Sequence, residues 1–108
     1  MSRNIRESDW KLFRELHPVA VNRFCESVLS EIARVASDAT KTPHTRYGEI
    51  FTLVRERDRL LARAFDDKRR STALLQLAII HSHGLLTAEE LARFSPEARE
   101  AITWRERI

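Results

Sequence analysis

Arg57 and Asp58 are the residues whose type and position best fit chemistry, because two charges interrupt an otherwise apolar helical stripe. An ionised group without a partner costs several kcal/mol when it leaves water. The pair therefore predicts one of three things: an ion pair, with Glu31 as candidate partner, a polar seam in a subunit interface, or a ligand site that includes His81. At about 100° per residue, the stripe consists of Tyr47, Ile50, Phe51, Leu53, Val54, Leu60, Leu61, Ala64 and Phe65.

A row of arginines could bind phosphates through sequence-independent, salt-sensitive contacts. Residues 41 to 70 hold nine Lys or Arg against five Asp or Glu. The interleaved acids make this a poor electrostatic footprint for nucleic acid and favour a solvated face. The row consists of Arg55, Arg59 and Arg63, spaced every four residues, followed by Arg69 and Arg70.

No catalytic, metal or cofactor signature accompanies these charges. Cys25 lies on an apolar arc, where burial raises a thiol pKa and disfavours a nucleophile. His81 and His83 point about 200° apart on a helix, and no ligand-spaced cysteine or acid stands near them. Two distant glycines cannot form a phosphate-binding loop. The sequence therefore names no catalytic residue, no metal ligand and no cofactor.

The composition is typical of one globular helical domain spanning residues 1–108. Hydrophobic residues make up 43% of the chain, whereas it has 2 Gly and 3 Pro. The formal net charge is +3. A single cysteine excludes an intrachain disulfide and favours the cytosol. The first ten residues lack an apolar signal core, and no apolar run is long enough for a membrane span, so we expect an unexported, cytoplasmic protein without membrane contact.

The apolar periodicity predicts three helices in the first 65 residues. Ser8 is the expected N-cap of a short first helix. This helix should end at Leu16, because Pro18 disfavours a helical conformation at His17 and suits the start of a second helix, 18–37. The third is expected over 46–65, capped by Thr42 or Thr45. A continuous helix through residues 66–71 is conceivable, but the next stripe is about half a turn out of phase, which favours a break there.

The remaining helices are indicated by capping residues. Gly84 has the position of a left-handed C-cap for a fourth helix that begins near Ala73. Thr87 and Glu90 have the spacing of a capping box. Ser95 followed by Pro96 predicts the start of a last helix ending near Trp104. The fourth helix is apolar on a second side as well, at Leu75 and Ile79.

The turn after the fourth helix resembles SHOCT-type hairpins, which are short helical elements implicated in oligomerisation. The resemblance covers residues 74–91 and implies a role in self-assembly. The chain has Leu91 where such hairpins usually carry an aromatic residue, and it lacks the basic residue that follows. The resemblance is carried by Leu74, Leu77, Gly84, Leu85, Leu86, Thr87, Glu90 and Leu91.

Together these patterns predict an all-α fold, a compact bundle of about five helices with a C-terminal helical hairpin. We expect a small, non-enzymatic protein-interaction or oligomerisation module, in the form of a homodimer that uses Leu75 and Ile79. The alternative is a nucleic-acid-binding accessory protein that uses the arginine row.

Overall fold

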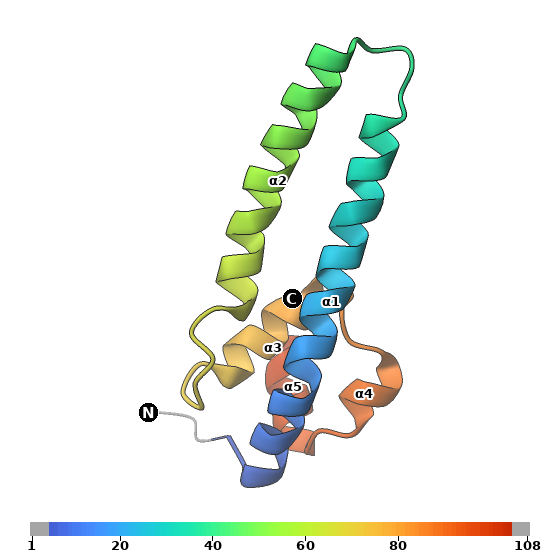
Figure 1. Ribbon diagram of the computed structural model, residues 1–108. Helices are drawn as coiled ribbons and strands as arrows, with labels where there is room; N and C mark the ends of the chain where they lie inside the picture. The colour runs from blue at the N-terminus through green and yellow to red at the C-terminus, as the bar shows by residue number, and fades with distance from the viewer. Residues whose placement is uncertain (1–4, 105–108) are drawn as a thin grey trace.

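The computed structural model describes residues 5–104, which form five helices and no strand. The all-α fold expected from the sequence is thereby confirmed. Two long helices, α1 and α2, run antiparallel and project as a hairpin from a base that contains the start of α1 and the three short helices (Figure 1). The molecule measures 52 × 29 × 25 Å. The helices are α1 (Glu7–Ala36), α2 (Pro43–Phe65), α3 (Ala73–Ser82), α4 (Ala88–Ala92) and α5 (Pro96–Thr103).

Helix α1 is one continuous helix of 30 residues with Pro18 in its interior, so the predicted break at His17 is wrong. Proline removes one backbone hydrogen bond and costs about 3 kcal/mol inside a helix. Packing offsets this cost, because α1 buries Leu16 before the proline and Ala20 after it. The predicted cap was also misplaced: Ser8 is exposed within the first turn, and Arg6 occupies the N-cap.

Helix α2 begins where Thr42 accepts a hydrogen bond from the Thr45 amide at 3.1 Å, with Pro43 in the first turn. It ends before Asp66, and the expected break lies over residues 66–72. Asp67 adopts a positive φ of 62° in this turn. The side-chain amide of the buried Gln76 donates to the backbone carbonyls of Asp66 and Asp67, which fixes the turn against α3.

The capping signals of the last 30 residues are confirmed. Gly84 has a φ of 72°, and the Thr87–Glu90 capping box is complete. The Ser95 side chain accepts from the Ala98 amide at 3.2 Å and starts α5. Helix α5 packs against α3, and α3 packs against both α1 and α2.

The hydrophobic core lies entirely in the base. From residue 25 to residue 63 no side chain is buried, although every residue of that stretch is described. The two arms of the hairpin therefore contact each other along one line, and each keeps most of its circumference in solvent. The buried apolar residues are Ile5, Leu12, Phe13, Leu16, Ala20, Phe24, Ala64, Phe65, Ala73, Leu77, Ile80, Leu85, Phe94, Ala98 and Ile102.

Candidate functional site

Arg57 and Asp58 lie in different environments. Arg57 points at α1 and donates hydrogen bonds of 3.2 and 2.9 Å to the two carboxylate oxygens of Glu31, as the ion-pair interpretation predicted. This contact raises the pKa of Arg57 and lowers the pKa of the Glu31 carboxyl. Asp58 is exposed on the surface of the hairpin. Arg57 thus holds the two arms together, whereas Asp58 is available to solvent or to another molecule.

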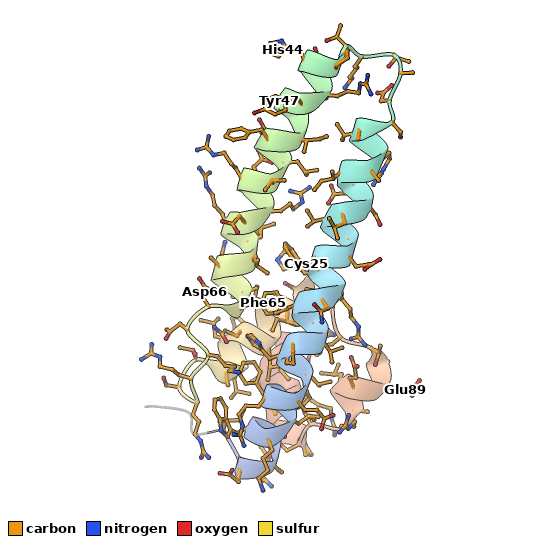
Figure 2. All side chains as sticks on the ribbon, viewed as in Figure 1. Cys25, His44, Tyr47, Phe65, Asp66 and Glu89 are labelled. Atoms are coloured by element: carbon orange, nitrogen blue, oxygen red, sulfur yellow. The ribbon has the colours of Figure 1, made fainter. Side chains whose placement is uncertain are left out.

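One side of the hairpin exposes a continuous set of large apolar side chains. The exposed fractions are 70% for Tyr47, 55% for Phe51, 44% for Val54 and 62% for Leu29. On α2, the first three of these and Asp58 fall within an arc of about 60° at 100° per residue. Figure 2 shows Tyr47 near the tip of the hairpin, far from the core. We call this set, Leu29, Tyr47, Phe51, Val54 and Asp58, the hairpin face.

A groove of about 240 Å³ runs beside the hairpin face between the two arms. Cys25 lies in its wall, between the tip and the base in Figure 2, and is partly exposed. Because seven of the nine groove residues are apolar, the groove and the hairpin face form one water-exposed, largely apolar surface. The groove is lined by Phe24, Cys25, Val28, Leu29 and Ile32 of α1 and by Val54, Arg57, Asp58 and Leu61 of α2.

The opposite side of the hairpin is polar. There an open depression is lined by acidic, basic and hydroxyl side chains, with apolar contributions from Val35 and Leu53. At the tip, Lys41 donates to both carboxylate oxygens of Glu49, at 2.6 and 3.0 Å. A hairpin that is polar on one side and apolar on the other is a surface suited to bind an apolar partner on one side only.

The hairpin face was missed in the sequence because Tyr47, Phe51 and Val54 were grouped in one apolar stripe with residues that contact α1 or the core. In the structure, a different strip of α2 contacts α1, and that strip includes Arg57 and Leu61. The spacing of four, three and four residues between positions 47, 51, 54 and 58 is the heptad pattern of a coiled-coil seam. That spacing was the available signal.

The other predicted interface residues lie in the base. Leu75 is exposed on α3, and Ile79 is half-buried against the core. They are not part of the hairpin face. His81 is also on α3, half-buried, and it does not line the groove beside Arg57 and Asp58.

The arginine row is exposed, but three of its members have partners. The Arg55 guanidinium lies 5.6 Å from the centre of the Phe51 ring. Arg69 pairs with Asp67 at 2.6 Å, and Arg70 pairs with Glu7 and stacks over Trp10. Arg59 and Arg63 continue the row on the exposed surface of α2. The row is therefore partly engaged in contacts within the chain.

Trp10 and Trp104 differ in their packing. Trp10 is half-buried and packs against Phe13, whereas Trp104 is exposed. Within residues 5–104, no cluster of three or more His, Cys, Asp or Glu has the arrangement of a metal site. None of the helices in that range is long and apolar enough to cross a membrane.

Comparison with known proteins adds no relative. The chain matches no protein family, no curated protein and no solved structure. The geometry of the hairpin and its contacts are therefore the basis for a functional assignment.

Proposed function

We propose that this protein is a small cytosolic, non-enzymatic interaction module, and that its α1–α2 hairpin is the part that binds another polypeptide. The single observation that carries the proposal is the exposure of the hairpin face, with two aromatic rings mostly in solvent. Single exposed apolar side chains are ordinary on protein surfaces. A contiguous patch at helical spacing, next to an apolar groove, is typical of a helix-binding interface.

The patch has the size of an interaction site. Aromatic side chains bury about 200 Å² each when covered, so the exposed fractions of Tyr47 and Phe51 amount to about 250 Å². Val54 and Leu29 bring the patch to roughly 450 Å², within the range of large functional patches on monomers. Leaving such a surface in water is unfavourable by roughly 25 cal/mol per Å², which is the driving force for a partner.

The occupant we propose is a helical segment with an apolar stripe. The hairpin presents straight helical ridges and a groove between two helices, which match the ridges of a third helix. The resemblance of residues 74–91 to SHOCT-type hairpins supports a role in assembly, although it falls in the base. Leu75, exposed on α3, is the second surface at which association could occur.

The experiment compares two single variants of the full chain. Phe51→Ser removes the centre of the hairpin face, and Arg59→Ser changes an exposed residue of the same helix outside that face. Wild-type and Arg59→Ser proteins are expected to retain the same polypeptides, or further copies of the chain, in an affinity capture, whereas Phe51→Ser loses them. Equal retention by all three proteins would refute the hairpin as the binding surface.

Leu75→Ser separates the hairpin face from the α3 surface. If Leu75→Ser abolishes association and Phe51→Ser does not, the interaction uses α3, as the sequence predicted, and the hairpin proposal is wrong. Circular dichroism at 222 nm should show the same helix content in all variants, because both residues are largely exposed.

A further inference from the structure

We infer that the occupant of the hairpin face is a second copy of this chain, packed antiparallel through α2, so that two hairpins form a four-helix bundle. This inference rests on the proposed function, since it names the partner for the same surface. The observation behind it is that the α2 stripe is complementary to itself. We call the four α2 residues of this stripe, Tyr47, Phe51, Val54 and Asp58, the seam.

The seam has the spacing of alternating d and a positions in a coiled coil, beginning with Tyr47 at d and ending with Asp58 at a. Leu61 and Phe65 follow at the same spacing but pack against α1 and the core, so the exposed part of the pattern ends at Asp58. A helix that carries a coiled-coil seam on a side that does not face its own neighbour is built to pack against an additional helix. In α2 the side facing α1 is marked by the Arg57–Glu31 ion pair.

The seam is symmetric about the point midway between Thr52 and Leu53. Phe51 and Val54 lie at equal distances on either side of this point, and so do Tyr47 and Asp58. A two-fold axis at this point, perpendicular to the helix, would place Phe51 against Val54 of the partner subunit, and Tyr47 against Asp58 of the partner subunit. Such a self-complementary patch is what an isologous dimer interface requires.

The polar ends of the seam decide the direction of packing. In the antiparallel pair, the Tyr47 hydroxyl can donate a hydrogen bond to the carboxylate of Asp58 of the partner subunit, so both polar groups leave water with a partner. In a parallel pair in register, each Asp58 carboxylate would face that of the partner subunit, which is repulsive. One polar residue in an apolar seam is a known device for selecting register and orientation.

The available area agrees with a dimer. A standard interface buries about 800 Å² on each partner, and homodimer interfaces are about 65% apolar, which requires about 500 Å² of apolar surface per subunit. The exposed parts of the apolar side chains of the hairpin face supply roughly 450 Å². These side chains are Leu29, Tyr47, Phe51 and Val54. The partly exposed groove residues Cys25, Ile32 and Leu61 add to this.

The first measurement is sedimentation equilibrium of the full chain from about 1 to 200 µM. The wild-type protein should fit a monomer–dimer equilibrium, and Phe51→Ser should remain monomeric over the range. Arg59→Ser should match the wild type. A wild-type monomer at the highest concentration overturns this inference while leaving the proposed function intact if Phe51-dependent capture of other polypeptides persists. Loss of both overturns the proposed function.

The second measurement tests the antiparallel register by changing the charge at its polar ends. Tyr47→Asp places two like-charged pairs in the interface and should weaken dimerisation at least 10-fold. Tyr47→Lys instead places a lysine against Asp58 of the partner subunit at both ends, so its dimerisation should stay within about 3-fold of the wild type. In a parallel, in-register pair Tyr47→Lys would place the two lysines against each other while the two Asp58 carboxylates still face each other, so it would dimerise as weakly as Tyr47→Asp, and that result would overturn the antiparallel arrangement.

Discussion

The Arg23 guanidinium donates two hydrogen bonds, of 2.7 and 2.9 Å, to the two carboxylate oxygens of Glu90. The same guanidinium donates to the Leu85 carbonyl at 2.9 Å. Helix α4 is only five residues long, and these contacts attach it to the middle of α1. Glu90 also closes the capping box of α4, so one carboxylate joins local and long-range structure.

Protonation of Glu90 should destabilise the fold. The hydrogen bonds from Arg23, more than any other cause, lower the pKa of Glu90 from 4.5 to about 2. Because the folded-state pKa is the lower one, the stabilisation is complete above pH 4.5 and is lost as the pH falls towards 2. We expect Glu90→Gln, which keeps the capping-box pattern, to lower the free energy of unfolding by about 2–3 kcal/mol at pH 7.

The measurement is urea unfolding of both proteins between pH 7 and pH 2, where the difference should shrink towards zero at the acid end. Glu89→Gln is the control, because Glu89 is exposed in the same turn. A Glu90→Gln difference that is constant over this pH range would show that the ion pair with Arg23 contributes no net stability.

Asp9→Ala should destabilise the fold by removing the hydrogen bonds that join the start of α5 to α1. Asp9 is buried and accepts hydrogen bonds from the Ser95 amide at 2.9 Å and the Ser95 hydroxyl at 2.6 Å. Without the carboxylate, the Ser95 amide loses its acceptor, and we expect a loss of about 2–3 kcal/mol in urea unfolding. The matched control is Glu15→Ala, which removes the exposed ion pair with Arg93 and should cost less than about 1 kcal/mol. Equal effects of the two variants would contradict the assignment.

Arg57→Ala and Asp58→Ala should differ in their effect on folding stability. Measured in the Phe51→Ser background, where association does not contribute, Arg57→Ala should lower stability by about 1–2 kcal/mol, because Glu31 loses its partner between the arms. Asp58→Ala should stay within about 0.5 kcal/mol, because Asp58 is exposed. Thermal unfolding by circular dichroism gives both values. The reverse order would mean that Asp58 has a structural role.

Pro18→Ala should stabilise α1. Alanine restores the missing amide, and it is about 3 kcal/mol more favourable than proline within a helix, less about 1 kcal/mol for the added freedom of the unfolded chain. We therefore expect a gain of about 2 kcal/mol in thermal or urea unfolding, against a change within about 0.5 kcal/mol for the exposed neighbour variant Val19→Ala. A loss of stability would show that the fold requires the local geometry that proline imposes.

The arginine row should not bind nucleic acid tightly. Arg69 and Arg70 are paired with acids, and the remaining members are interleaved with Glu56 and Asp58. Fluorescence anisotropy with labelled single- and double-stranded oligonucleotides, at about 50 and 200 mM salt, should show no saturable binding at the higher salt concentration. Tight binding that falls steeply with salt, and that is lost in Arg59→Ser/Arg63→Ser, would instead favour the nucleic-acid alternative.

In the last 30 residues, local signals were sufficient to predict the helix ends, whereas the cap predicted at Ser8 was wrong. Gly84, the Thr87–Glu90 box and Ser95 act on the adjacent backbone, so their types and spacing were sufficient to place the helix ends. Pro18 was misinterpreted because its effect is decided by distant residues: burial of Leu16 and Ala20 on both sides of it keeps α1 continuous.

The heptad spacing of the hairpin face is present in the sequence, but periodicity alone does not show what the face packs against. A stripe of apolar residues has the same pattern whether it packs within the chain or against another chain, and α2 carries two such stripes side by side. The Arg57–Glu31 pair is one of the three arrangements that the sequence left open, and the structure shows it for Arg57 alone, because a charge facing a neighbouring helix requires a partner. The exposure of Tyr47 and Phe51 depends on where α3 and α5 pack, and that is a property of the tertiary structure.

The confinement of the buried core to the base implies two levels of protection against amide hydrogen exchange. Opening the outer turns of α1 and α2 exposes little additional apolar surface, so their amides should exchange through small local fluctuations. Amides beside Phe13, Leu77 and Ile102 should exchange only when the whole domain unfolds. The base is thus the stable part of the molecule, whereas the stability of the outer turns of α1 and α2 depends on what packs against them.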